Sequence, residues 1–219
     1  MKRTTATATL SREWIPYVAP FAVFSVVTYA GPLFNLSPGQ IYLIRMFLTA
    51  STLYLFRNNF KQEIVPVFSW PAVLAGALVF FIWVLPENLY PHIGSSEFNP
   101  YADSSGMNPY LLMTIRLTGA ALLVPVMEEL FWRSFAMRLM IRSDFKSVPL
   151  GAFTWFSFII VSVAFGFEHH RWLVGIAAGA IYAWVLYRSK NLFEPILAHA
   201  VTNLMLGIYV IQSGEWSFW

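Results

Sequence analysis

PYLLMTIRLTGAALLVPVMEELFWRSFAMRLM, residues 109–140, is an apolar run with adjacent glutamates and an arginine in its interior. At about 1.5 Å per residue, a helix of this length exceeds the ~30 Å hydrocarbon core of a membrane. Ionisable groups at that depth are costly, so they indicate a functional site by default. The stretch therefore predicts a membrane-spanning helix and a site that includes Glu128, Glu129 and Arg133.

Six further apolar runs lie outside this stretch, at about 14–34, 40–56, 67–86, 149–168, 172–188 and 192–212. The chain of 219 residues is 58% hydrophobic and only 11% charged, whereas soluble domains carry roughly 25% charged residues. We therefore predict an all-α, polytopic transmembrane helical bundle of about seven spans. It forms a single integral membrane domain over residues 1–219, with three helices and a long outer loop in 1–108 and a four-helix catalytic core in 109–212.

Basic residues are concentrated in alternate connections, which indicates the orientation of the chain. Ten lie on one side and two, Arg171 and Arg116, on the other, and the long loop before residue 109 has acids but no Lys or Arg. We predict a multi-pass protein of the cell inner (plasma) membrane with a cytoplasmic amino terminus. The net charge is +3, but the basic residues are distributed as membrane topology requires. We therefore predict no nucleic-acid partner. The ten basic residues are Lys2, Arg3, Arg12, Arg57, Lys61, Arg138, Arg142, Lys146, Arg188 and Lys190.

Spacing separates the roles of the two glutamates. Adjacent helical residues point about 100° apart, so Glu128 and Glu129 face different neighbours. Glu129 precedes Arg133 by four residues, which is the favourable order for an ion pair on one helix face. We therefore predict that Glu129 and Arg133 form a buried supporting pair. The segment places no second arginine to neutralise Glu128, which favours a functional role for that carboxylate.

Two later apolar runs supply further polar side chains. His199 and Asn203 are four residues apart, so both can donate hydrogen bonds to one point, as an oxyanion site requires. His169 ends the run of residues 149–168, and we interpret the neighbouring Glu168 and His170 as interfacial residues without a role. Three separate segments therefore bring polar groups into the membrane, which predicts a shared polar cavity inside the bundle.

The depths of these groups do not agree if every helix is straight and complete. Counted along their helices, Glu128 and His199 lie near the middle of the membrane, but His169 ends an outward-running helix and should lie near the outer face. One water molecule can reach Glu128 and His169 only if Pro125 breaks its helix or the fifth helix ends short. Either change predicts a water-filled cavity that reaches the outer face near His169.

A zinc site is the competing chemical interpretation. Two histidines with one or two carboxylates could ligate zinc. However, the HExxH spacing of the common zinc-protease helix is absent, and the charge of Arg133 would disfavour a nearby dication. The chain has no cysteine, which excludes disulfides, thiolate ligands and a cysteine nucleophile. We therefore predict no metal and no cofactor.

Taken in order, EExxxR at 128–133, FxxxH at 165–169 and HxxxN at 199–203 resemble the motifs of one known family. This is the CPBP family, the CAAX prenyl protease and bacteriocin-processing (Abi) proteins. The resemblance covers roughly residues 110–210, and the first three apolar segments carry no signature of it. It implies an all-helical intramembrane protease of the glutamate type.

The resemblance also implies a role for each motif residue. Glu128 would activate water together with His169, while His199 and Asn203 would bind the developing oxyanion. Glu129 and Arg133 would support that arrangement. One departure is the EHHR run after Phe167, where family members usually continue with apolar residues, and it leaves the depth of His169 open.

The seven-helix build, with its long loop before the EExxxR helix, resembles a subgroup of CAAX protease-related proteins linked to exosortase systems in bacteria. This implies a membrane protein or peptide as substrate and an exosortase-linked system as partner. Two other classes stay open: a non-catalytic immunity or scaffold protein of the same fold, and a transporter that uses Glu128 in a proton relay. The His–Asn pair favours the protease, because a proton relay needs no oxyanion site.

Overall fold

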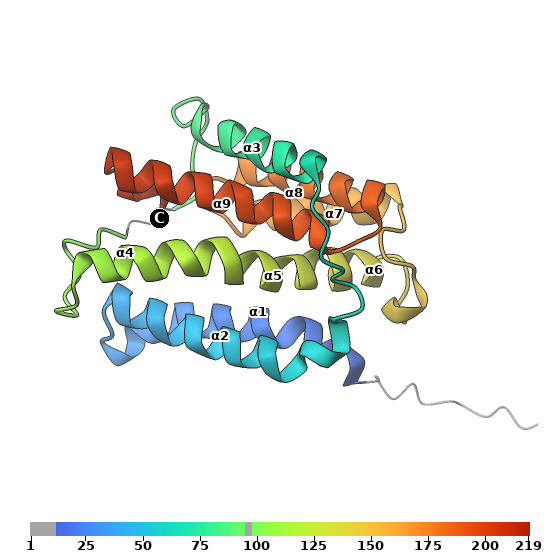
Figure 1. Ribbon diagram of the computed structural model, residues 1–219, viewed down its shortest axis with the longest axis horizontal. Helices are drawn as coiled ribbons and strands as arrows, with labels where there is room; N and C mark the ends of the chain where they lie inside the picture. The colour runs from blue at the N-terminus through green and yellow to red at the C-terminus, as the bar shows by residue number, and fades with distance from the viewer. Residues whose placement is uncertain (1–11, 95–97) are drawn as a thin grey trace, which may run out of the picture.

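The computed structural model describes residues 12–94 and 98–219, drawn in colour in Figure 1. Within these ranges it contains helices and no strand, which confirms the predicted all-α bundle. Lys2 and Arg3 of the predicted cytoplasmic amino terminus lie outside them. Six of the seven main helices are single α-helices: Ile15–Ala30 (α1), Pro38–Phe60 (α2), Trp70–Val84 (α3), Trp155–Phe167 (α7), Trp172–Ser189 (α8) and Phe193–Ser213 (α9).

The remaining helix, Pro109–Leu139, is continuous but changes its winding twice. Its parts are Pro109–Thr118 (α4), a π-helical turn Gly119–Leu123, Val124–Glu129 (α5), a second π-helical turn Leu130–Ala136, and Met137–Leu139 (α6). Single π-helical turns inside α-helices occur frequently at functional sites. The segment that carries both glutamates therefore has the winding that often accompanies function.

Pro125 explains the first π-helical turn. Proline has no N–H to donate, and its ring collides with the carbonyl four residues earlier in a regular α-helix. Directly before it the backbone widens, and the N–H of Val124 donates to the carbonyl of Gly119, five residues back. The helix is therefore not broken at Pro125, which was one of the two ways to bring Glu128 and His169 together.

Not every apolar run yields a helix long enough to cross a membrane. In the part of the chain that the structure describes, four helices meet that criterion by length and composition, among them Pro109–Leu139 and α9. However, α3 and α7 have only 15 and 13 residues, which is roughly 20 Å each. The run predicted from residue 149 starts its helix only at Trp155, because a turn at Gly151 (φ +71°) comes first. At its other end α7 stops at Phe167, so the fifth main helix ends short.

The helix Pro109–Leu139 lies between two groups of helices (Figure 1). On one side α1 packs against α2, and on the other α3 packs on α9 and α8, while α7 packs on α8. Close approach depends on glycine at two crossings. A side chain at Gly76 would collide with the carbonyl oxygen of Ala198 in α9, and one at Gly175 with the backbone of Gly166 in α7. The site therefore forms where α9, α7 and α8 face the central helix.

Candidate active site

One cavity of about 260 Å³ brings the three motifs together. Its lining includes the four predicted catalytic residues, Glu128, His169, His199 and Asn203. It also includes Arg171, in the connection between α7 and α8, so it extends toward the end of the bundle that we predict to be outside. Residues up to 75 positions apart in the sequence thus share one space, as the sequence predicted.

Glu128 is a buried carboxylate directed at this cavity. Only 5% of its surface is exposed, and its Oε2 atom has no hydrogen-bond partner among the residues that the structure describes. The ring of His199 lies beside it, with Nε2 4.0 Å from that oxygen. A buried oxygen without a partner costs roughly 1–3 kcal/mol, so it is usually kept for a ligand or for chemistry. Glu128 is therefore available to a water molecule in the cavity.

Glu129 connects Arg133 to His199. Its Oε2 lies 3.0 Å from Arg133 Nε, and its Oε1 lies 3.0 Å from Nδ1 of His199. The arginine pair is within ion-pair distance although neither atom has hydrogen-bond alignment. Arg133 Nη2 donates instead to the carbonyl of Gly179, at 3.2 Å. The ion pair predicted from spacing is present, while the contact from Glu129 to His199 was not predicted.

The ring of His199 is held on two sides. It stacks on Tyr182 of α8, with centroids 4.8 Å apart and planes at 19°. The Tyr182 hydroxyl donates to Thr202, whose own hydroxyl contacts the carbonyl of Gly76. Because Nδ1 faces the carboxylate of Glu129, Nε2 is the atom that faces the cavity and Glu128. Glu129 and Tyr182 together fix the direction of His199.

Asn203 binds the central helix at a backbone carbonyl that Pro125 leaves without its donor. In a π-helical turn the carbonyl of Ala120 would accept from the residue five positions on, which is Pro125 and has no N–H. Asn203 Nδ2 donates to that carbonyl at 2.8 Å. The amide therefore lies on the cavity wall in a fixed position, and it ties α9 to the helix that carries Glu128. The signal in the sequence was the proline five residues after Ala120.

His169 follows the end of α7 and turns back over it. Its Nδ1 lies 2.9 Å from the carbonyl of Phe165, which can only accept, so Nδ1 carries the proton. In the neutral ring Nε2 is then an acceptor. Trp83 of α3 meets the ring edge-on, at 5.3 Å between centroids. The early end of α7 places His169 on the wall of the cavity that Glu128 lines, so the shortened helix is the alternative that the structure adopts.

Sequence reasoning missed much of the cavity wall, including four polar or charged residues from outside its predicted set. Glu168, interpreted as interfacial, lines the cavity, and its carboxylate accepts a hydrogen bond of 3.0 Å from Trp132 Nε1. The available signal in the sequence was Trp132, which follows Glu128 by four residues and therefore lies on the same helix face. The other three, Tyr42, Arg45 and Arg116, come from α2 and α4 and lie outside the three motifs.

Metal ligands do not gather at the site in the part of the chain that the structure describes. In residues 12–94 and 98–219, no group of three or more His, Asp or Glu side chains is arranged to hold a metal ion. The glutamate–histidine contacts described above are pairs directed at one another. The donor set around this cavity therefore offers hydrogen-bond chemistry.

The same region matches a family model. Residues 108–205 match the model described as type II CAAX prenyl endopeptidase Rce1-like, and this range contains Glu128, His169, His199 and Asn203. No curated protein and no solved structure matches the chain. The exosortase-linked subgroup stays a prediction. The stretch from residue 108 to 205 belongs to the Rce1-like type II CAAX prenyl endopeptidases of the CPBP family, in a chain whose apolar helices make it a membrane protein.

Proposed function

We propose that this protein is an intramembrane endopeptidase in which Glu128 activates water to hydrolyse a peptide bond. Family membership implies protease activity, and the glutamate mechanism is our inference from the site. The observation that carries it is the Oε2 of Glu128, which has no hydrogen-bond partner among the described residues and lies on the wall of a cavity shared with His169, His199 and Asn203. A carboxylate in that position has water as its available partner.

The proposed step begins with a water molecule between Glu128 and Nε2 of His169. Glu128 takes a proton from the water, whose oxygen attacks the carbonyl carbon of the peptide. The electron pair of the carbonyl moves onto its oxygen, which accepts hydrogen bonds from His199 and Asn203. When this intermediate collapses, the C–N bond breaks and Glu128 returns its proton to the departing amine. One water molecule and one peptide bond give one carboxylic acid and one amine.

Glu129 and Arg133 act through His199 in this proposal. The carboxylate of Glu129 accepts from Nδ1 of His199, and the doubly protonated form of the ring also offers Nε2–H to the oxyanion. Arg133 balances the charge of Glu129 and packs over Phe165, 4.4 Å from the ring centroid. Both are therefore positioning residues.

We further propose that the substrate is a membrane protein or peptide, and that the chain lies in the inner membrane with its amino terminus in the cytoplasm. The ends of α2, α6 and α8 lie at one end of the bundle and carry most of the described basic residues. That asymmetry supports the orientation. A polar cavity enclosed by apolar helices supports a substrate that enters from the membrane or its surface.

The test is a comparison of new peptide termini in membranes. Purified wild-type protein is incubated with membranes from cells that lack it, and mass spectrometry identifies new amino termini. We expect termini that appear with the wild type and are missing with Glu128→Gln. Their presence with both proteins, or with neither, would contradict the proposal. Wild-type cleavage that stops on chelation and returns with zinc would transfer the proposal to a metalloprotease.

A further inference from the structure

A groove between α3 and α8 has a volume of about 760 Å³. It is separate from the active-site cavity, because none of its described lining residues also lines that cavity. On one face of α8, Tyr182 stacks on His199, whereas Ile181 and Trp184 of the same helix line the groove. Leu78 and Trp184 are 52% and 60% exposed, so the groove opens to the surroundings of the helices. In a membrane protein those surroundings are lipid.

The groove is polar at one end and apolar along the rest of its length. Its polar end is formed by Ser69 directly before α3, Arg188 near the end of α8 and Glu194 near the start of α9. These three helix ends lie toward the same end of the bundle (Figure 1). Leu78 and Ala180 lie about two helical turns from that polar end, so the apolar wall extends roughly 12 Å along both helices. A phospholipid has the same division into a polar headgroup and apolar chains.

Arg188 and Glu194 border this polar end with opposite charges but do not pair with each other. The ion pairs among the described residues do not include either side chain, although they extend to separations of 4.0 Å. The two charged groups therefore lie farther apart than an ion pair while they share one space. A ligand that has both an anionic and a cationic group can contact both.

Both charged side chains keep hydrogen-bonding capacity. The Arg188 guanidinium lies 5.9 Å from the ring centroid of Trp184, and it forms no hydrogen bond within residues 12–94 and 98–219. Glu194 Oε2 accepts from the Ser69 hydroxyl at 2.8 Å, while its Oε1 has no hydrogen-bond partner in the same part of the chain. Ser69 also accepts from the N–H of Ala72 at 3.3 Å, and this second contact fixes the hydroxyl that holds Glu194. The groove therefore offers one cationic donor and one anionic acceptor.

These two charges distinguish among the common phospholipid headgroups. Arginine binds the phosphate that all of them contain. A carboxylate accepts N–H bonds from the primary ammonium group of phosphatidylethanolamine. The choline headgroup has methyl groups in place of those donors, and phosphatidylglycerol has no cation to set against Glu194. Phosphatidylethanolamine therefore complements the pair best.

We propose that this groove is a binding site for one phosphatidylethanolamine molecule. The lipid phosphate contacts Arg188, its ammonium contacts Oε1 of Glu194, and an acyl chain lies along the apolar wall between α3 and α8. A second copy of this chain is the competing occupant. The change from polar to apolar along the groove matches the layers of a bilayer, which favours the lipid. The site lies outside the active-site cavity, so the inference does not depend on the proposed function.

The test is native mass spectrometry of the full-length protein purified in dodecyl maltoside. Phosphatidylethanolamine, phosphatidylcholine and phosphatidylglycerol with identical acyl chains are titrated separately. The fraction of protein that carries one lipid gives an apparent affinity. We expect phosphatidylethanolamine to bind roughly tenfold tighter than either of the others, the value of one charge-assisted contact. Equal affinity for phosphatidylethanolamine and phosphatidylcholine would overturn the inference.

Two variants should change the affinities in different ways. Glu194→Gln should reduce the preference for phosphatidylethanolamine over phosphatidylcholine to about twofold, because a neutral amide replaces the carboxylate. Its affinity for phosphatidylcholine should stay unchanged, which shows that the groove is intact. Arg188→Gln should lower the affinity for both lipids by a similar factor of roughly ten, because both contain the phosphate.

Arg57→Gln is the matched control for Arg188→Gln. Arg57, like Arg188, is exposed near the end of its helix and lies over an aromatic ring of the same helix, that of Tyr54 at 3.9 Å from the centroid. It does not line the groove, so its substitution should leave all three affinities unchanged. If Glu194→Gln does not fold, Arg188→Gln, at an exposed position, decides the test by itself.

Three further outcomes would overturn the inference. They are a full preference for phosphatidylethanolamine that survives Glu194→Gln, unchanged affinities in Arg188→Gln, and a loss of affinity in Arg57→Gln equal to that in Arg188→Gln. A lipid-free dimer that dissociates on Arg188→Gln would assign the groove to a second copy of the chain. None of these measurements involves hydrolysis, so the proposed protease activity could stand while the lipid site fails, or the reverse.

Discussion

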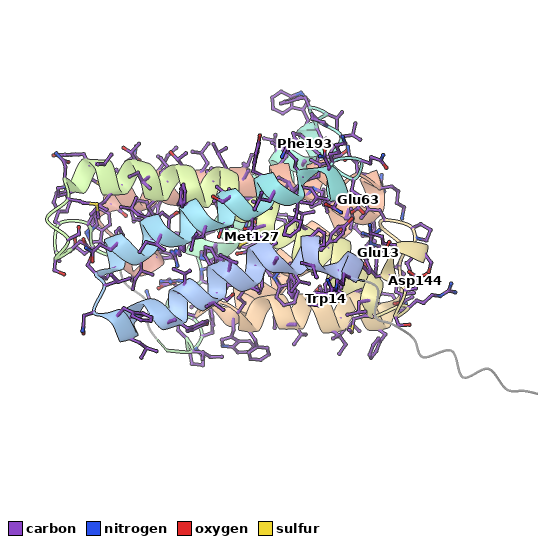
Figure 2. All side chains as sticks on the ribbon, turned by 90° about the horizontal axis from the view of Figure 1, so that it is seen from below. Glu13, Trp14, Glu63, Met127, Asp144 and Phe193 are labelled. Atoms are coloured by element: carbon purple, nitrogen blue, oxygen red, sulfur yellow. The ribbon has the colours of Figure 1, made fainter. Side chains whose placement is uncertain are left out.

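The central helix carries two charged clusters, and they differ in how fully their hydrogen bonds are satisfied. At one end of the bundle, Glu63 accepts hydrogen bonds from Arg138, Ser134 and the hydroxyl of Tyr17. In the interior, the cluster of Glu128, Glu129, Arg133 and His199 lines or borders the cavity. Figure 2 shows the difference in position, with Glu63 near the end of the bundle and Met127, the neighbour of Glu128, near its middle.

The cluster around Glu63 has the properties of a structural tie. It joins the connection after α2 to α1 and to the central helix, and the backbone carbonyl of Glu63 accepts from Leu192 just before α9. In the interior cluster, Glu128 Oε2 and Arg133 Nη1 lack partners within the described ranges. Satisfied networks stabilise a fold, whereas buried atoms left unsatisfied cost free energy. The comparison therefore separates a stabilising cluster from one that retains binding capacity.

The largest expected effect is on catalysis, at the unsatisfied carboxylate. Glu128→Gln removes the proton acceptor but keeps the size of the side chain. Turnover of the peptides found in the terminus comparison should fall by roughly a thousandfold. The thermal midpoint should stay near that of the wild type, because Oε2 has no described partner to lose. A fully active Glu128→Gln protein would show that the unsatisfied carboxylate is not needed for catalysis, and the two clusters would then not differ in function.

The second effect is on both stability and turnover, at Glu129, which contacts Arg133 and His199. Glu129→Gln leaves Arg133 buried without its counter-charge and should lower the free energy of unfolding by about 3 kcal/mol. Turnover should also fall, because His199 loses the group that holds Nδ1. Chemical denaturation measures the free energy of unfolding, and the peptide assay measures turnover. Glu215→Gln, at an exposed site, is the control, and a stable Glu129→Gln protein would contradict the assigned role.

Local spacing predicted most of the fold and part of the site. Hydropathy gave the seven helices, and the i,i+4 relation gave the Glu129–Arg133 pair. Both are properties of a single segment, which a sequence displays directly. The predicted contact among three motifs came from the cost of burying polar groups, and the cavity lining agrees with it.

The remaining features depend on how segments meet in space. The bond from Glu129 to His199 joins residues 70 positions apart, and nothing in either helix alone indicates it. The early end of α7 depends on the turn at residues 168–171, which apolar length could not reveal. Arg45 and Arg116 come together through the packing of α2 on α4 around Tyr42, which neither segment indicates by itself.

A third effect should fall on stability alone, at the satisfied cluster. Glu63→Gln removes the charge that Arg138 and Ser134 contact and should lower the free energy of unfolding by about 2 kcal/mol. The affinity and turnover of the peptide substrate should change less than twofold. A double-mutant cycle with Arg138→Gln measures the coupling between the two side chains. Loss of turnover without loss of stability would reverse the assignment of the two clusters.

The smallest effect concerns Asp103, a second carboxylate with satisfied hydrogen bonds, in the loop at the other end of the bundle. It accepts from the N–H groups of Gly39 at 2.8 Å and Ser105 at 3.0 Å, and from the hydroxyl of Ser37 at 3.3 Å. Partial burial pushes the pKa of Asp103 upward, but hydrogen bonds from Ser105, Gly39 and Ser37 together hold it below its usual value. The folded state therefore favours the charged form of Asp103, and this tie contributes stability only while the carboxyl is ionised.

The sign of the pH effect follows from that lowered pKa. The contribution of Asp103 is complete above the unfolded-state pKa of about 3.9 and is lost as the pH falls through the lower folded-state pKa. At pH 7, Asp103→Asn should therefore lower the free energy of unfolding by about 1 kcal/mol. The difference from wild type should stay constant down to about pH 5 and shrink at more acidic pH. Asp144→Asn, at an exposed site at the opposite end of the bundle, is the matched control. A difference that grows on acidification would mean that Asp103 is not held as a carboxylate, and the loop would then lack the satisfied tie that distinguishes it from the active site.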